Sequence, residues 1–160
     1  MKEKVYIETS VISYLCARTS RDIVLAAHQS VTQDWWDHHR KRYDCYVSEF
    51  VLQEVAAGDP EAAEARMSVA EAMPQLAVSS QTATVARELL SRTKLSKKVA
   101  VDLAHIATAA VYGIDYLLTW NCAHIANPHW QPRIRCILED TGYACPVICT
   151  PLELLEGESS

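Results

Sequence analysis

The sequence predicts an α/β fold in which a parallel sheet of about five short strands is covered by helices. Short apolar segments alternate along the chain with longer stretches in which apolar residues recur every three or four positions. Residues 99–110 form such a helical stretch and lead past Gly113 into an apolar segment at 114–119, the helix-to-strand step that parallel sheets repeat. With 160 residues, the chain fits one domain with a sizeable core.

The first strand is expected at residues 4–9, where an apolar run is followed by a carboxylate, Glu8. Ser10 is expected to cap a short helix at 11–16, because a serine oxygen accepts a hydrogen bond from a free N–H group at a helix start. Asp22 is expected to cap a second, longer helix in the same way. One stripe of that helix is apolar and is predicted to face the core, at Ile23, Ala27, Val31 and Trp35.

The middle of the chain is expected to add two strands and three helices. Ser48 follows the first of these strands and begins a helix that Gly58 ends. Asp59 and Pro60 then begin another helix, since an acidic cap followed by proline is a strong start signal. The strands are expected at 44–47 and 76–78, and the helices at 48–57 (with Phe50, Val51 and Val55 inward), 59–73 and 82–90.

The last third of the chain places the helix at 99–110 and the strand at 114–119 before a looped or helical region that passes Pro128 and Pro132. A helix at 134–139, a strand at 147–149 and a tail helix at 150–155 complete the expected elements. The sequence contains no internal repeat or linker. Residues 1–156 are therefore predicted to form a single domain, with 157–160 as a short tail.

Composition narrows the functional classes. The formal net charge of −5 is not that of a protein that coats nucleic acid nonspecifically, so any polyanion must be gripped locally. The six cysteines include no Cys-x-x-Cys pair, and we expect them to be buried or idle. No secretory signal and no apolar run of about 18 residues occurs. A cytoplasmic protein with reduced thiols and no membrane contact is expected.

Four polar side chains fall where parallel sheets collect ligands. Glu8 ends the first strand and Asn121 follows the fourth, so both point to the carboxyl edge of the sheet. Glu54 lies on the helix after the second strand, and Asp102 lies near the start of the helix before the fourth. If the first and fourth strands are neighbours, three acids and an amide share one pocket. The mutual repulsion of the acids must then be offset by positive charge.

Hard oxygen ligands without an organised set of Cys or His favour Mg²⁺ or Mn²⁺ over zinc. Such an ion activates water while it bridges phosphate oxygens, which is the chemistry of phosphodiester hydrolysis. A bound cation also reverses the local sign of charge, and this would let an acidic protein engage RNA.

Four segments of the chain resemble the PIN domain, and VapC-like toxins in particular. They are residues 6–10 (YIETS), 51–55 (VLQEV), 102–107 (DLAHIA) and 118–125 (LTWNCAHI). Each motif is short, but all four occur in the family's order with matching strands around them, and together they span nearly the whole chain.

The resemblance implies a three-layer sandwich with a central parallel sheet of about five strands, in which acids hold Mg²⁺ or Mn²⁺. It also implies cleavage of single-stranded RNA, a homodimer and inhibition by an antitoxin. Thr9 and Thr119 match hydroxyl residues that contact water or phosphate. The chain departs from the family at two positions. Glu8 stands where aspartate is usual, and Asn121 stands where an acid is frequent, which removes one negative charge.

Each candidate residue also has an ordinary structural interpretation. Glu54 alone would be a solvated helix residue, and Asp102 alone a charge that favours the helix dipole. Asn121 suits a helix cap as well as a ligand role, and the two are compatible. His105, three residues after Asp102, is either a hydrogen-bonded core histidine or a partner of the site. Two further sets of residues could contact RNA. The basic residues are otherwise simply solvated, at 38–42 and at Lys94, Lys97 and Lys98. The aromatic pair is otherwise packed in the core or an interface, at Trp35 and Trp36.

The sequence thus predicts a metal-dependent endoribonuclease in which Glu8, Glu54 and Asp102 hold the ion and Asn121 completes or orients the site. The alternative is a catalytically weakened PIN-fold module that binds RNA or a partner protein. A phosphohydrolase that acts on small phosphoesters is a third, less favoured hypothesis.

Overall fold

The computed structural model of the chain describes residues 1–158 and is organised around a sheet of parallel strands. The strand order is β3-β2-β1-β4-β5, so β1 lies at the centre with β2 and β4 as its neighbours. Tyr6 of β1 pairs with Tyr46 of β2 and Leu117 of β4. The predicted neighbourhood of the first and fourth strands is confirmed. The strands are β1 (Lys4–Ile7), β2 (Asp44–Ser48), β3 (Gln75–Leu76), β4 (Tyr116–Leu118) and β5 (Val147–Cys149).

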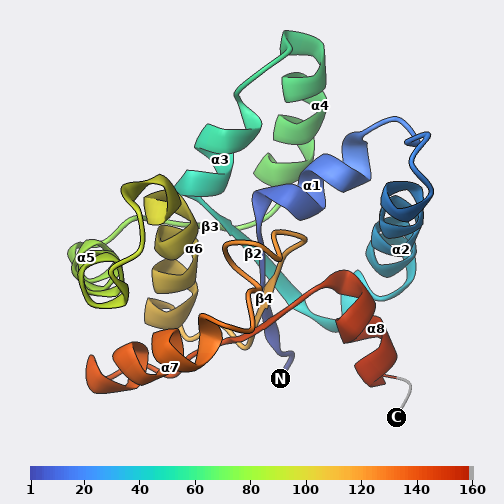
Figure 1. The fold of residues 1–160 in the computed structure, drawn as a ribbon. Coiled ribbons are helices and arrows are strands. Elements are labelled where there is room, and N and C mark those ends of the chain that lie inside the picture. The colour runs from blue at the N-terminus through green and yellow to red at the C-terminus, as the bar shows by residue number, and fades with distance from the viewer. Residues whose placement is uncertain (159–160) are drawn as a thin grey trace.

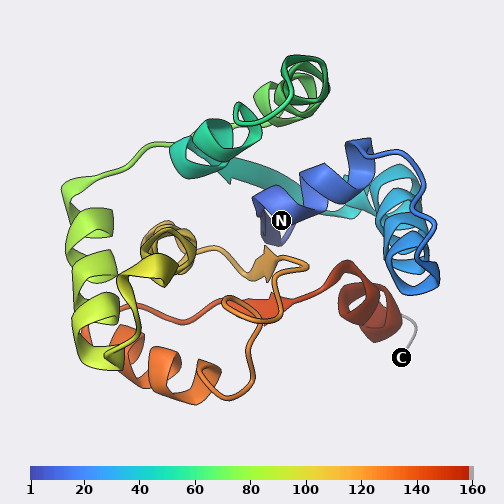
Figure 2. The same cartoon turned by 45° about the horizontal axis from the view of Figure 1, so that its top comes forward.

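Helices cover both faces of the sheet, which confirms the three-layer arrangement. Figures 1 and 2 place α5, α6 and α7 on one side of the sheet and α1, α2 and α8 on the other, with α3 and α4 packed together at the top of both views. The α-helices are α1 (Thr9–Cys16), α2 (Ile23–His38), α3 (Glu49–Val55), α4 (Pro60–Glu71), α5 (Ser80–Thr93), α6 (Ala100–Val111), α7 (Gln131–Asp140) and α8 (Pro151–Glu158). Two short 3₁₀ helices, η1 (Arg40–Arg42) and η2 (Lys97–Val99), precede β2 and α6.

The core lies on both faces of the central strand. Val5, Tyr6 and Ile7 are fully buried, as expected for a parallel strand covered by helices on both sides. The predicted apolar stripe of α2 is right at Trp35, which is fully buried, and wrong at Ile23, which is 86% exposed, and at Ala27, which is also exposed. The buried residues of α2, Thr32 and Trp35, lie in its C-terminal half, so its first turn extends past the core.

Several helix starts follow the sequence signals. The side chains of Asp22, Ser48 and Asp59 each accept a hydrogen bond from the backbone at the start of α2, α3 and α4. The predicted cap of the first helix is wrong, because Glu8 occupies that position and its carboxylate accepts from the N–H of Ser10. A glutamate reaches the free N–H groups from the strand end, and the helix begins at Thr9 instead of Val11.

Other boundaries differ by a few residues. The third strand is Gln75–Leu76 and excludes Val78, which is 38% exposed. The helix predicted at 82–90 begins at Ser80 and reaches Thr93, because Ser79 caps it. The helix predicted at 134–139 begins at Gln131, since the proline at its second residue lies in the first turn, where a missing N–H is harmless.

The last described helix is attached to the region around η1. Glu158 accepts from His39 Nδ1 at 2.6 Å and from Arg42 Nη1 at 3.0 Å, and it also bonds to the Tyr43 hydroxyl. Residues 157–158 of the predicted tail are the end of α8, while 159–160 lie outside the described residues. None of the helices formed by residues 1–158 has the length and apolar composition needed to cross a bilayer.

We expect Asp22→Ala to lower the free energy of unfolding by about 1 kcal/mol, because its carboxylate accepts from the Leu25 N–H at 2.8 Å at the start of α2. Urea unfolding followed by circular dichroism measures the change. Asp37→Ala, near the C-terminus of the same helix, is the matched control and should be neutral or slightly stabilising, since an acid there opposes the helix dipole. Equal destabilisation by both variants would contradict this assignment of the cap.

Candidate functional site

The strand end at Glu8 is the most buried acidic position of the site. Its side chain is 5% exposed, and it leaves β1 directly into α1. Oε1 accepts from the hydroxyls of Ser10 and Thr119, both at 2.5 Å, and Oε2 accepts from the Ser10 N–H at 3.1 Å. Three donors therefore replace the water that burial removes, and they hold the carboxylate at the junction of β1 and β4.

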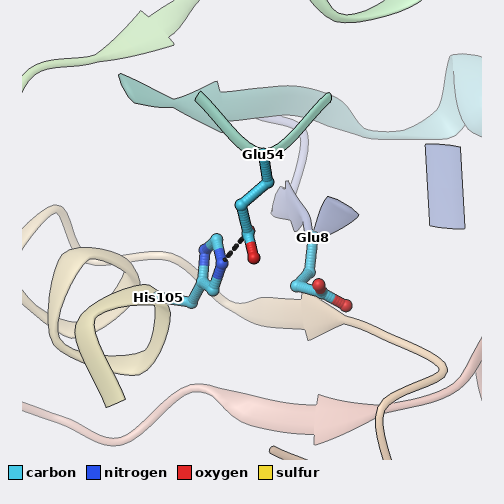
Figure 3. A group of neighbouring side chains, drawn as sticks. All are labelled: Glu8, Glu54 and His105. Carbon is cyan, nitrogen blue, oxygen red and sulfur yellow. Dashed lines mark hydrogen bonds and ion pairs between the residues drawn. The ribbon is translucent and has the colours of Figure 1, made fainter. Parts of the chain in front are cut away.

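Glu54 approaches the same place from α3. Its Oε1 accepts from Thr9 Oγ1 at 2.7 Å and lies 2.6 Å from His105 Nε2. Among residues 1–158, Glu54 Oε2 makes no hydrogen bond. Figure 3 shows the Glu54 carboxylate between the His105 ring and the Glu8 side chain. One oxygen of Glu54 is therefore fixed by the protein, and the other is available to a ligand.

His105 connects this carboxylate to the core. The ring is fully buried, and its Nδ1 lies 2.6 Å from the Tyr6 hydroxyl, which in turn lies 2.6 Å from Ser48 Oγ. With Nε2 donating to Glu54, a single hydrogen between Nδ1 and the Tyr6 hydroxyl completes the chain, so every member is satisfied. His105 is thus a hydrogen-bonded core histidine and also a partner of the site. Both alternatives left open by the sequence hold together.

Asp102 and Asn121 meet on the other side of the site. Asn121 Nδ2 donates to Asp102 Oδ1 at 3.3 Å, while its Oδ1 accepts from the His124 N–H at 3.0 Å. His124 Nδ1 lies 3.3 Å from Asp102 Oδ2. The Asn121 carbonyl, a predicted ligand, therefore caps the turn that follows it, and the amide nitrogen orients Asp102.

Trp120 anchors the segment that carries Asn121. Its N–H donates to Ser10 Oγ at 2.8 Å, and its indole Nε1 donates to Thr32 at 2.8 Å. The ring stacks between His28 at 4.2 Å and Tyr14 at 5.7 Å between centroids. This packing ties the end of β4 to α1 and α2, which leaves the residues after Trp120 in a defined position.

The environments of the two half-buried acids shift their pKa values in opposite directions. Burial by itself raises the pKa of Glu54, but the hydrogen bond and charge of His105, together with the Thr9 hydroxyl, outweigh it and lower that pKa below its ordinary value. Burial raises the pKa of Asp102; His124 and His105 oppose the rise, and the charges of Glu8 and Glu54 add to it. The three acids are thus close enough to repel one another.

The donor set fits a hard divalent cation. One ligand atom each of Glu8, Glu54 and His105 lie within 4.8 Å of one another, the spacing of a group that surrounds an ion. Both nitrogens of His105 already have partners in the protein, so the carboxylate oxygens are the better ligands. Oxygen ligands suit Mg²⁺ or Mn²⁺, and a cation would also relieve the repulsion that acts on Asp102. The residues present therefore fit such an ion.

The structure brings Glu8 and Glu54 together, whereas Asp102 lies outside the group of ligand atoms within 4.8 Å of one another and is connected to Glu8 through Asn121 and Thr119. The Thr9 hydroxyl donates to Glu54, and the Thr119 hydroxyl donates to Glu8. Sequence reasoning missed Ser10 as a donor to Glu8. It also missed the Tyr6–Ser48 pair behind His105, because no signal in the sequence connects residues 42 positions apart.

We expect Glu54→Gln and Asp102→Asn to have opposite effects on stability in EDTA. Because the pKa of Glu54 is lowered, its charge stabilises the fold above the ordinary pKa of 4.5, and this contribution is lost as the pH falls through the lowered value. Glu54→Gln should therefore cost about 1 kcal/mol at pH 7, allowing for its partial exposure. Because the pKa of Asp102 is raised, its ionisation in the folded protein lowers the free energy of unfolding. This loss is present above the raised pKa and disappears as the pH falls below the ordinary value of 3.8. Asp102→Asn should therefore stabilise the protein at pH 7.

Urea unfolding between pH 3 and 8, without divalent metal, measures both differences. Each should shrink toward zero at the acidic end of the range. Destabilisation by Asp102→Asn at pH 7 in EDTA would show that the Asp102 charge is favourable without metal, contrary to this account.

No protein-family model and no curated protein matches the chain. Six chains of solved structures resemble it. The VapC20 toxin of Mycobacterium tuberculosis, described as cleaving the sarcin-ricin loop, matches with a TM-score of 0.60 and 18% identity over 78% of this chain and 95% of that chain.

A chain of VapBC2 from Rickettsia felis, solved with a DNA fragment from their promoter, matches with a TM-score of 0.61 and 14% identity. The match covers 92% of this chain and 98% of that chain. At such identities the likeness concerns the fold. The chain therefore has the PIN-domain fold of these VapC-type structures, as its sequence resemblance implies.

Proposed function

We propose that this protein is a metal-dependent endoribonuclease that cleaves single-stranded RNA in the cytoplasm, as the toxin of a toxin–antitoxin pair. The observation that carries the proposal is the convergence of Glu8 and Glu54 at the carboxyl edge of the sheet, with Asp102 joined to Glu8 by hydrogen bonds through Asn121 and Thr119. The fold shared with VapC20, a toxin described as cleaving the sarcin-ricin loop, supports the same reaction class.

In this proposal Glu8, Glu54 and Asp102 hold Mg²⁺ or Mn²⁺, and Asn121 orients Asp102. The ion, when bound, supplies charge to the phosphate oxygens and lowers the pKa of a water near the phosphorus. The protein supplies the positions. Ser10 and Thr119 hold the Glu8 carboxylate, and Thr9 and His105 hold one oxygen of Glu54. The carboxylates thus meet their ligand in a preset arrangement.

An antitoxin and a second copy of the chain are proposed as protein partners on the strength of the family resemblance. The start of α2 supports a partner surface, since Ile23 is 86% exposed and Val24 is 64% exposed. Burial of these side chains in an interface would be favourable. Light scattering during size-exclusion chromatography, with Ile23→Ser as the variant and Ser30→Ala as control, tests the dimer.

Incubation of end-labelled single-stranded RNA with the protein and Mn²⁺, Mg²⁺ or EDTA tests the reaction. Cleavage is expected with either metal and not with EDTA, and a duplex of the same sequence should resist. Calorimetric titration with Mn²⁺ separates the binding-module alternative. If the protein binds RNA but neither binds Mn²⁺ measurably nor cleaves RNA, the binding module is the correct hypothesis and the ribonuclease is wrong. Hydrolysis of small phosphoesters alone would indicate the phosphohydrolase.

A further inference from the structure

A small recess lies beyond His124, the residue that contacts Asp102 of the proposed metal site. Its volume is about 60 Å³, and it is lined by Thr93, Leu95, His129, Trp130 and Arg133. His124 connects it to the site, because its Nδ1 lies 3.3 Å from Asp102 while its ring stacks on Trp130 with an interplanar angle of 3°. His124 therefore lies between Asp102 and the indole that borders the recess.

The aromatic wall of the recess is fixed before any ligand arrives. Asn127 accepts from the N–H of Trp130 at 3.1 Å through its backbone oxygen and from the N–H of His129 at 2.9 Å through its side chain. The centroids of His124 and Trp130 are 5.8 Å apart with parallel planes, so the rings are offset and part of the indole face is uncovered. Trp130 is half-buried and His124 is 48% exposed, which leaves both rings accessible.

The chemistry of the lining suits an anion next to a flat ring. Arg133 donates through Nε and Nη2 to the Arg92 carbonyl at 3.1 and 2.6 Å, which fixes the guanidinium plane. Among the described residues, Arg133 Nη1 makes no hydrogen bond, and no carboxylate lines the recess. The exposed Lys94 lies between two lining residues in the chain. A larger cavity of about 460 Å³, by contrast, is lined by Glu3, Glu153 and Glu158, which exclude a polyanion.

We propose that Trp130 and Arg133, which border this recess, form a nucleotide subsite for single-stranded RNA on the far side of His124 from Asp102. Trp130 stacks on one base, and Arg133 contacts the phosphate of that nucleotide. A base exposes its face in a single strand, whereas a duplex keeps it stacked within the helix. The subsite would thus favour unpaired RNA over a duplex. It deepens the proposed function and rests on it, because RNA is the substrate of that function.

Fluorescence anisotropy with a labelled single strand of about ten nucleotides, in EDTA so that no metal-dependent cleavage occurs, measures binding alone. Trp130→Leu should raise Kd about tenfold, because leucine keeps apolar bulk but cannot stack. Trp130→Phe should raise it less than about threefold. Arg133→Gln should raise Kd about threefold and reduce the slope of log Kd against log salt by about one. Tyr112→Leu, at the end of α6 opposite to Asp102, is the aromatic control and should leave Kd unchanged.

Urea unfolding curves check that each variant folds. If Trp130→Leu does not fold, the affinity of Arg133→Gln for the single strand tests the proposal. Wild-type affinity of both variants for the single strand would overturn the subsite, as would equal loss of affinity for a duplex. The two proposals fail separately. If the wild-type protein cleaves RNA and Trp130→Leu does so with an unchanged KM, the subsite is wrong and the nuclease proposal stands. Trp130-dependent binding without metal-dependent cleavage removes the nuclease and keeps the subsite.

Discussion

Glu8→Gln is expected to lower the rate of RNA cleavage at least about a hundredfold, the largest effect of any single substitution in this protein. Glu8 is the most buried acid of the site. Three hydrogen-bond donors hold its carboxylate close to that of Glu54. An amide carries no charge. Its NH₂ group would also face the N–H or hydroxyl hydrogens of Ser10 and Thr119, so the side chain would turn away from its present position.

The measurement is single-turnover cleavage of labelled RNA in Mn²⁺, with Mn²⁺ affinity from calorimetry. Glu49→Gln on α3 is the matched control because Glu49 is exposed, and it should cleave at the wild-type rate. Cleavage by Glu8→Gln within about threefold of wild type, far below the loss expected for a metal ligand, would remove Glu8 from the reaction.

Glu8→Asp separates charge from reach. Aspartate is the usual residue at this position in the family that the sequence resembles, but it is one methylene shorter than the residue that bonds Thr119 across 111 positions of the chain. We expect Glu8→Asp to retain more activity than Glu8→Gln because the charge persists. Equal activity of the two variants would show that the length of the side chain decides function.

His105→Ala is expected to lower the free energy of unfolding by about 2–4 kcal/mol and the affinity for Mn²⁺ by about tenfold or more. The ring is fully buried and bonds both Tyr6 and Glu54. Its removal leaves a cavity beside Tyr6, whose hydroxyl keeps only Ser48 as a partner. Glu54 keeps only Thr9, so the orientation of its carboxylate becomes loose.

Urea unfolding and calorimetric titration measure the two effects on His105→Ala. His105→Phe refills the volume without hydrogen bonds, so it should recover part of the stability and none of the Mn²⁺ affinity. His38→Ala on α2 is the matched control, since that side chain is 70% exposed. Wild-type Mn²⁺ affinity in His105→Phe would show that His105 has a packing role and does not position Glu54.

Local signals in the sequence predicted most of the fold. Capping groups at Asp22, Ser48 and Asp59 act within three residues of the helix starts that they specify. The boundaries that were wrong are those where two local signals compete. Glu8 and Ser10 both suit the start of α1, and the longer side chain of Glu8 reaches the free N–H groups from the strand end. Pro132 suits both a loop and a first helical turn.

The acids of the site were predictable because each stands beside a recognisable strand or helix. Their partners were less so. His105 pairs with Glu54 across 51 positions and with Tyr6 across 99. Such pairs depend on the register of β1 against β2 and on the packing of α6, which are properties of the folded chain and not of any short segment.

The bond from Thr119 to Glu8 has a consequence for protein synthesis. Glu8, the first proposed ligand, is translated early, yet its hydroxyl partner Thr119 directly follows β4, which pairs with β1 only after some three-quarters of the chain has been made. A growing polypeptide on the ribosome therefore has no assembled centre. The proposed nuclease would therefore be inactive toward the surrounding ribosomal and messenger RNA until its own translation is nearly finished.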